Sequence, residues 1–236
     1  MRNATRRRLT AALAVGLVMT MTGCGALDST GSTPTGDALY RAGEKHFIDY
    51  STVMHSVIMA IHEGDWSVDT YGASPVPCRI DGEVAGYAFS WVRMLQPAQL
   101  DVDAAARTAG EAFESAGMKV ETASRGSGDA AEVTVVATGG PVGRGVVTIR
   151  PARGTIEASA ATDCFRGDAG DLSDMVFGGL IYDTSWQRFP AFEGPDWSPR
   201  FYFPEDGSPV YRDDDGTPVE PQPASTDLPV APYGAP

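Results

Sequence analysis

The sequence predicts an α+β fold, a two-layer sandwich in which helices cover one face of an antiparallel or mixed sheet of about five strands. Three observations predict it. Apolar residues recur with helical period over residues 37–63, a second helical pattern follows Asp101, and short alternating or β-branched segments separated by glycine come after it. We expect these elements to form one domain over residues 37–175.

Residues 1–23 are predicted to be a lipoprotein signal peptide. Arginines precede an uncharged, mostly apolar run from Leu9 to Thr22, which has signal-peptide length and is too short to span a bilayer comfortably. The run closes with Met21-Thr22-Gly23-Cys24, which resembles the bacterial lipobox. The resemblance implies cleavage before Cys24, which would expose a thiol and an amine for lipid attachment. Residues 24–36 are small and polar and are expected to form a flexible stalk. The alternatives are an ordinary secretory signal and an uncleaved anchor.

A single amphipathic helix is expected to open the domain. Gly64 supplies its stop. The buried stripe consists of Phe47, Tyr50, Met54, Val57, Ile58 and Ile61. His55 and His62 lie on the same helix about 10 Å apart along its axis, so one metal ion cannot bridge them. We interpret these histidines as flanks of the stripe.

The remaining elements of the domain are one helix and five strands. Alternating aromatic residues predict a strand over about 84–95. Asp101 can cap the second helix, and Gly117 can end it where a positive φ is needed. Four further strands are expected at residues 119–123, 132–138, 145–150 and 155–161.

The composition changes near the C-terminus. Eleven of the 17 prolines lie in residues 186–236, together with eight aromatic side chains between Trp186 and Tyr211. That many rings can bury enough area to offset the entropy of ordering the chain, so we expect residues 176–219 to dock on the domain. Residues 220–236 are mostly proline, small and acidic, and we expect them to be disordered.

Four features carry a resemblance to a known group of proteins. Met21-Thr22-Gly23-Cys24 resembles the bacterial lipobox, with Met in place of the commoner Leu, and one helix, Pro77-Cys78 and a segment from Thr162 to Phe165 follow it. The scarcity of lysine and asparagine suggests a GC-rich genome. The chain therefore resembles small cell-envelope lipoproteins of actinobacteria. Those families carry no established activity, so the resemblance implies an anchored domain and brings no catalytic residues.

With Cys24 assigned to lipid, Cys78 and Cys164 remain as an even pair, which in an exported protein indicates a disulfide. We expect Cα atoms about 5 to 6 Å apart and stabilisation of roughly 4 to 5 kcal/mol from closing so long a loop. Because Cys78 comes just before the first predicted strand and Cys164 just after the last, the bond should join the two ends of the chain segment that forms the sheet. The alternative is a redox or nucleophilic cysteine, but the sequence has no Cys-x-x-Cys spacing and its histidines all precede Cys78.

The charge of the chain limits its partners. The formal net charge is −13, and removal of residues 1–23 strips four arginines and no acid, leaving 14 basic against 31 acidic residues, or −17. A polyanion of this size does not bind nucleic acid nonspecifically. It should also be repelled by anionic lipid headgroups and wall polyanions, which fits a body held at the membrane by its lipid rather than by its surface. The simpler account of the acidic charge, which we favour, is solubility.

No motif predicts a metal, a cofactor or a nucleophile. Asp168, Asp171 and Asp174, and the separate run of aspartates at 213–215, lack the spacing of an EF-hand loop. The glycine-rich segment 139–145 lacks the Lys-Ser/Thr ending of a phosphate-binding loop, and the sequence has no serine nucleophile elbow.

Three carboxylates, Glu193, Asp196 and Glu205, lie among aromatic residues and could serve a glycan hydrolase. The simpler interpretation is that the rings pin the segment to the domain.

These observations favour a non-enzymatic lipoprotein on the extracytoplasmic face of the cell membrane. We expect it to bind an envelope protein or a wall component through its C-terminal aromatic segment. The candidate ligand-contacting residues are Trp197, Phe201, Tyr202 and Tyr211. The alternative is binding of a glycan or peptidoglycan by the same rings, and an envelope hydrolase is the third hypothesis.

Overall fold

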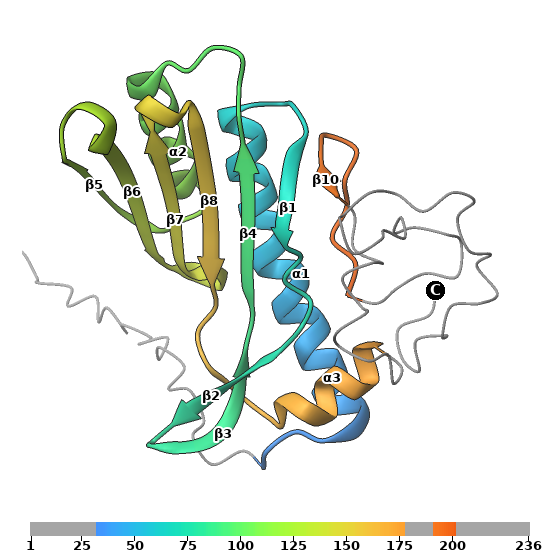
Figure 1. Ribbon diagram of the computed structural model, residues 1–236. Coiled ribbons are helices and arrows are strands. Elements are labelled where there is room, and N and C mark those ends of the chain that lie inside the picture. The colour runs from blue at the N-terminus through green and yellow to red at the C-terminus, as the bar shows by residue number, and fades with distance from the viewer. Residues whose placement is uncertain (1–31, 178–190, 202–236) are drawn as a thin grey trace, which may run out of the picture. The chain divides into compact units, whose positions relative to one another are not determined.

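The computed structural model describes residues 32–177 and 191–201. The predicted signal peptide, Cys24, Tyr202, Tyr211 and the C-terminal tail therefore lie outside the described residues. Within these bounds the fold is α+β, as predicted (Figure 1). The α-helices are α1 (Gly36–Ile61), α2 (Val102–Ser115) and α3 (Ala169–Phe177).

A seven-stranded sheet and a three-stranded sheet carry the fold, and all paired strands in both are antiparallel. The large sheet has the order β10-β1-β4-β8-β7-β6-β5, and the small sheet has the order β2-β3-β9. The strands of the large sheet are β1 (Trp66–Thr70), β4 (Ser90–Leu95), β5 (Lys119–Arg125), β6 (Glu132–Gly139), β7 (Gly143–Arg150), β8 (Thr155–Ala161) and β10 (Phe192–Glu193). The strands of the small sheet are β2 (Val76–Ile80), β3 (Glu83–Ala88) and β9 (Phe165–Arg166). Beyond the predicted five strands, the large sheet gains β1 and β10, and the small sheet gains β2 and β9.

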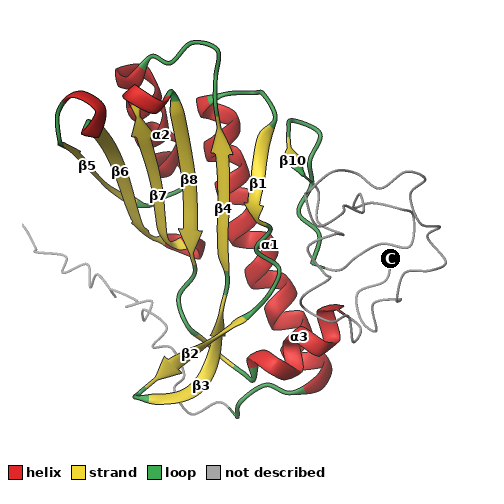
Figure 2. Cartoon of the chain, viewed as in Figure 1, coloured by secondary structure: helices red, strands yellow, loops and turns green. Residues whose placement is uncertain are grey.

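Helices α1 and α2 cover one face of the large sheet (Figure 2). The predicted stripe of α1 is buried from Phe47 to Ile58, and Ile61 packs against it while partly exposed. The helix layer approaches the sheet closely at Gly145 of β7, where a Cβ would lie 2.6 Å from the Phe113 ring of α2. Among residues 32–177 and 191–201, no helix is long and apolar enough to cross a bilayer.

The ends of α2 follow the predicted chemistry. The Asp101 carboxylate accepts a hydrogen bond from the amide of Ala104 at 2.9 Å, which caps the start of the helix. Gly117 has φ of 78° just beyond the end, a conformation that glycine adopts without a steric penalty.

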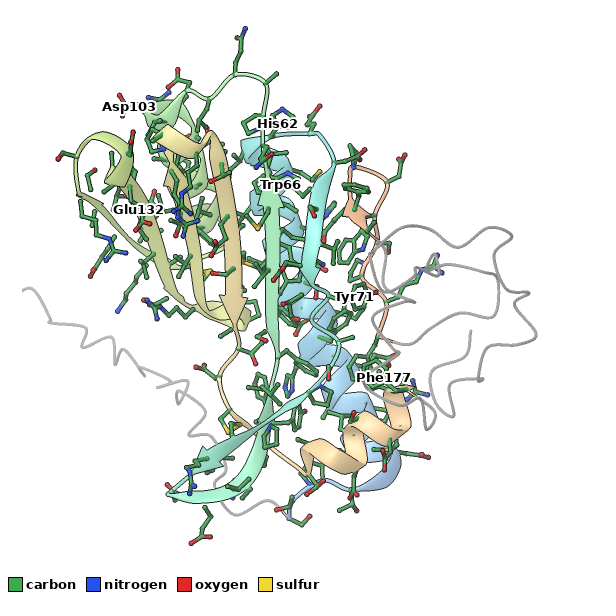
Figure 3. All side chains as sticks on the ribbon, in the orientation of Figure 1. His62, Trp66, Tyr71, Asp103, Glu132 and Phe177 are labelled. Atoms are coloured by element: carbon green, nitrogen blue, oxygen red, sulfur yellow. A yellow bond between two sulfur atoms is a disulfide. The ribbon has the colours of Figure 1, made fainter. Side chains whose placement is uncertain are left out.

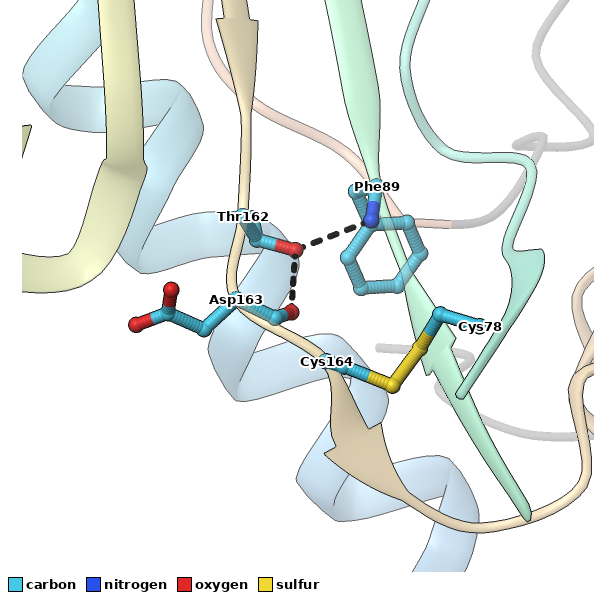
Figure 4. Close-up of a disulfide and its surroundings, with 5 residues drawn as sticks. All are labelled: Cys78, Phe89, Thr162, Asp163 and Cys164. Atoms are coloured by element: carbon cyan, nitrogen blue, oxygen red, sulfur yellow. Dashed lines mark hydrogen bonds between the residues drawn. A yellow bond between two sulfur atoms is a disulfide. The ribbon is translucent and has the colours of Figure 1, made fainter. Parts of the chain in front are cut away.

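The strand predicted over about 84–95 is two strands in different sheets. Tyr87, Phe89 and Trp91 share one buried face, as expected from their alternation. At Phe89, however, the backbone amide donates to the hydroxyl of Thr162 at 2.9 Å rather than to a strand carbonyl (Figure 4). This side-chain acceptor interrupts the ladder, so the chain leaves β3 in the small sheet and enters β4 in the large one.

Helix α3 lies where the sequence showed three regularly spaced aspartates. The Asp168 side chain accepts from the amide of Asp171 at 2.9 Å, so it caps the first turn of α3. Leu172 and Val176 are buried beneath the helix. Asp168 therefore belongs to a helix N-terminus, and α3 continues past residue 175 to Phe177.

Candidate functional site

Part of the predicted docked segment, residues 191–201, lies along the edge of the large sheet. Strand β10 pairs with β1, with Glu193 opposite Trp66 and Phe192 opposite Ser67. The Val68 amide adds a hydrogen bond to the carbonyl of Ala191 at 2.8 Å. This pairing fixes the backbone of the first three residues of the segment.

The far end of the segment is held by a buried tyrosine. The Tyr71 hydroxyl donates to the carbonyl of Arg200 at 3.0 Å (Figure 3). Burial raises the pKa of Tyr71 to about 12, so the phenol keeps its proton and remains a donor at physiological pH. A neighbouring phenol, that of Tyr50, donates to the carbonyl of Gly72 at 2.7 Å, and burial raises its pKa too.

Glu193 is the electrostatic centre of the docked segment. Its side chain is fully buried, and Oε2 accepts from Nε of Arg93 on β4 at 2.6 Å. The other oxygen, Oε1, lies 2.7 Å from Nδ1 of His55 on α1. A buried carboxylate is tolerated only when it is paired and hydrogen-bonded, and both oxygens of Glu193 have partners.

Arg93 is also fully buried, and each nitrogen of its guanidinium donates a hydrogen bond. Its Nη atoms donate to the carbonyls of Thr70, Val92 and Tyr71 at 2.5, 3.0 and 3.3 Å. The guanidinium lies 4.4 Å from the centre of the Trp91 ring, a cation–π contact. Burial lowers the pKa of Arg93, and the Glu193 carboxylate opposes that effect. Arginine keeps its proton in proteins, so Glu193 accepts from a buried cation.

Two aromatic side chains of the segment reach the surface. Phe192 is 57% exposed. Trp197 is partly exposed, its ring centre lies 5.1 Å from that of His55, and its amide donates to the carbonyl of Gly194 at 3.0 Å. Strand pairing fixes the backbone at Phe192, and the turn fixes it at Trp197. We call Phe192 and Trp197 together the aromatic surface.

Phe201 is not part of that surface and corrects one of the predicted ligand contacts. It is 1% exposed, with ring centres 5.3 Å from Tyr40, 5.4 Å from Phe47 and 5.8 Å from Phe89. Gly43 on α1 makes room, because a Cβ there would lie 3.1 Å from the Phe201 ring. Phe201 is thus an anchor in the core, and of the four predicted ligand residues only Trp197 is described at the surface.

The predicted carboxylate cluster does not form a described catalytic pair. Glu193 is occupied by Arg93 and His55, Asp196 is exposed, and Glu205 lies outside the described residues. In the part of the chain that the structure describes, no three His, Cys, Asp or Glu side chains converge as metal ligands. An open groove of about 490 Å³ lies elsewhere, lined by α2, β5 and β6.

The predicted disulfide is present. Cys78 and Cys164 are bonded, with Cα atoms 5.9 Å apart (Figure 4). Contrary to the prediction, the bond does not join the two ends of the chain segment that forms the large sheet. Cys78 lies in β2 and Cys164 immediately precedes β9, and both strands belong to the small sheet. The bridge instead crosses β3 above Gly86, where a Cβ would lie 2.6 Å from the Cys164 sulfur. The absence of a side chain at Gly86 leaves the space that the bridge occupies.

Sequence reasoning did not identify Arg93 or its two partners as a unit. One signal was available, since Arg93 follows Phe89 and Trp91 at the inward positions of an alternating strand. A cation at an inward position requires a buried acid, but nothing local selects Glu193, which is 100 residues away.

Comparisons with protein-family models, with curated proteins and with solved structures found no match to this chain. The function is therefore argued from the chain's own residues.

Proposed function

We propose that this protein is a lipid-anchored protein on the extracytoplasmic face of the cell membrane. On this proposal it binds an envelope protein or a wall component without catalysing a reaction. Anchoring is supported by Cys24, which follows an apolar signal run, and by the disulfide, since such bonds persist in oxidising compartments outside the cytosol.

The observation that carries the binding role is the rigid presentation of the aromatic surface. Glu193 and Phe201 are buried on either side of Trp197, so the segment between them is held at both ends. Exposed aromatic side chains are frequent anchors of protein interfaces. Because Phe192 and Trp197 are already ordered, a partner meets them with little further loss of conformational entropy.

The binding role is tested by capture from detergent-solubilised envelope. Deleting everything after Phe177 would also remove Glu193 and Phe201 and uncover the core, so point variants at the surface test the proposal more cleanly. We expect a partner captured by the wild type to be lost with the double variant Phe192→Ser, Trp197→Ala and retained with Asp103→Asn on α2. Equal capture by all three proteins would reject the aromatic surface as the binding site.

Anchoring is tested separately by Cys24→Ser. The variant should leave the membrane fraction or accumulate as an unprocessed precursor, because the serine hydroxyl replaces the thiol that takes the lipid. If it fractionates and migrates like the wild type, the lipoprotein assignment fails.

A glycan or peptidoglycan ligand is the second candidate, favoured by the partly exposed Trp197 ring beside the exposed carboxylate of Asp196. Sugars stack on such rings and hydrogen-bond to such acids. Soluble peptidoglycan fragments should then change the tryptophan fluorescence of the wild type, and Trp197→Ala should abolish the change. A fluorescence change that persists in the variant would exclude this ring as the sugar site. An envelope hydrolase finds least support, because Glu193 is engaged in the core.

A further inference from the structure

The β2–β3 hairpin carries exposed large hydrophobic side chains. Of the three large hydrophobic side chains that are exposed among residues 32–177 and 191–201, two lie on this hairpin, Val76 at 41% and Val84 at 62%. Both lie on the face that carries Cys78, because Val76 is two residues from Cys78 and Val84 is two residues from Gly86, the partner of Cys78. A register shift between Cys78 and Arg79 brings Arg79 opposite Val84.

The hairpin projects from the body of the molecule (Figure 1). Its only described strand partner is the two-residue strand β9, which pairs with the inner part of β3. The tip is closed by a turn in which Arg79 donates to the carbonyl of Gly82 at 2.7 Å. Helix α3 contacts both β2 and β3, yet Val76 and Val84 stay exposed.

The charges near the tip balance, unlike those of the whole chain. The hairpin and β9 together carry Arg79 and Arg166 as bases and Asp81 and Glu83 as acids, and Arg166 lies 3.8 Å from Asp81. The chain as a whole has a net charge of −13. An anionic lipid surface therefore repels the protein as a whole more strongly than it repels this hairpin, and a zwitterionic surface has no net charge with which to repel it.

The hairpin lies at the end of the molecule where the chain enters the fold. Gly167 lies between the first turn of α1 and β3. A Cβ at this glycine would be 2.4 Å from Leu39 of α1 and 3.1 Å from Tyr87 of β3. Farther along α1, His46 hydrogen-bonds the Tyr87 hydroxyl at 3.0 Å. Figure 1 shows the start of α1 and the hairpin at the same end of the body.

The covalent distance from this end to Cys24 is short. Gly36 begins α1, and the stretch from Cys24 to Gly36 can span at most about 43 Å when fully extended. A lipid on Cys24 therefore keeps the hairpin end within that distance of the bilayer.

We propose that the β2–β3 hairpin is a second membrane contact, in which Val76 and Val84 enter the headgroup region of the bilayer that holds the lipid of Cys24. This inference rests on the proposed anchoring and assigns an orientation to it. His55 is the twentieth residue of α1, about 29 Å along the helix from its start, and the Trp197 ring lies beside it, so the aromatic surface is held away from the lipid.

The test uses the chain from Cys24 to Pro236, in which Cys24 is the only free thiol once Cys78 and Cys164 are bonded. Cys24 is coupled to maleimide-headgroup lipids in phosphatidylcholine vesicles, and amide hydrogen exchange is compared with that of uncoupled protein at the same lipid concentration. We expect hairpin amides to exchange about tenfold more slowly after coupling, the factor that burial of one valine side chain gives.

Two variants decide the outcome. Val84→Asp should lose the slowing while exchange in α1 stays unchanged, which shows that the fold is intact. Phe192→Asp removes an equally exposed apolar side chain at the aromatic surface and should keep the slowing. If coupling leaves hairpin exchange unchanged, or if Val84→Asp keeps the slowing, the hairpin is not a membrane contact.

Chemical coupling separates this result from the anchoring proposal. A hairpin that fails to respond in coupled vesicles overturns the second contact even if cells lipidate Cys24. Conversely, suppose that hairpin amides exchange more slowly in coupled vesicles while Cys24→Ser fractionates like the wild type in cells. That pair of results would support lipid contact by the hairpin and reject natural anchoring through Cys24.

Discussion

Two regions of this molecule hold distant segments together by different chemistry. In the small sheet, the Cys78–Cys164 disulfide joins residues 86 apart in sequence. At the edge of the large sheet, the Arg93–Glu193 ion pair joins residues 100 apart. The covalent bond lies beside exposed valines, whereas both members of the ion pair are fully buried.

The difference follows from how much core each region has. The small sheet has three strands, one of them two residues long, and its hairpin is exposed, so it has little apolar area to bury. A disulfide stabilises such a region without needing a core. The ion pair needs the opposite setting, because it contributes only where water is excluded and every polar atom has a partner.

The largest effect is expected from removing the covalent link. The double variant Cys78→Ser, Cys164→Ser should lose roughly 4 to 5 kcal/mol of unfolding free energy, since the unfolded chain regains the entropy of a long open loop. Urea unfolding of the variant and of the oxidised wild type measures it, with Cys24→Ser as the control that should unfold like the wild type. A loss below about 1 kcal/mol would mean that the small sheet does not depend on the bridge.

The next effect is expected from the ion pair. Glu193→Gln keeps the side-chain shape and leaves the Arg93 cation without a buried anion, a change that costs about 3 to 5 kcal/mol when the structure cannot relax. Here it can relax, because residues 191–201 can undock and admit water to Arg93. We therefore expect a smaller loss in global unfolding free energy and faster proteolysis within residues 191–201.

Asp196→Asn is the matched control, because Asp196 is an exposed acid on the same segment. It should change stability by no more than about 0.5 kcal/mol. If Glu193→Gln is cleaved within residues 191–201 no faster than this control, the ion pair does not hold the segment in place.

A smaller effect separates two glycines. Gly86→Ala should destabilise by about 1 to 3 kcal/mol, because the new Cβ would lie 2.6 Å from both the Cys164 sulfur and the carbonyl of Phe165. Gly110→Ala on α2 should instead stabilise by about 0.5 to 1 kcal/mol, since its nearest neighbour would be Val120 at 3.7 Å and alanine favours a helix. Thermal unfolding of the two variants tests the contrast, and equal shifts would contradict it.

The smallest effect concerns pH at the disulfide end. The His46 ring stacks on Phe165 at 3.6 Å, and burial, aided by Lys45 and opposed by Asp49, lowers its pKa below 6.5. As pH falls below 6.5, the unfolded chain binds a proton that the folded chain does not, so the unfolding free energy decreases.

His46→Phe keeps a ring for the stack and removes the titrating group, so its urea midpoint should vary less with pH over this window. Tyr87→Phe keeps the imidazole and should retain the pH dependence. Parallel pH profiles for the wild type and His46→Phe would exclude His46 as the source.

The sequence by itself determined the elements whose signals are local. The apolar period of α1, the Asp101 cap and Gly117 end of α2, and the β-branched alternation from β5 to β8 are each contained in a short window. The disulfide was also predictable, because only two cysteines remain once Cys24 is set aside. Helix α3 was not predicted, although its cap, Asp168, is present in the sequence. The spacing of the three aspartates was compared with that of calcium-binding loops and not used to predict a helix.

Only the tertiary structure decided which distant segments meet. The alternation through Tyr87, Phe89 and Trp91 is continuous, so no local signal showed that Phe89 passes from one sheet to another. Likewise, the local sequence around Glu193 resembles that of any acidic turn, and Arg93 became its partner because β10 docks beside β1. Periodicity is a property of neighbouring residues and is written in the sequence, whereas the choice of partner depends on which buried charges and strand edges the completed fold brings within bonding distance.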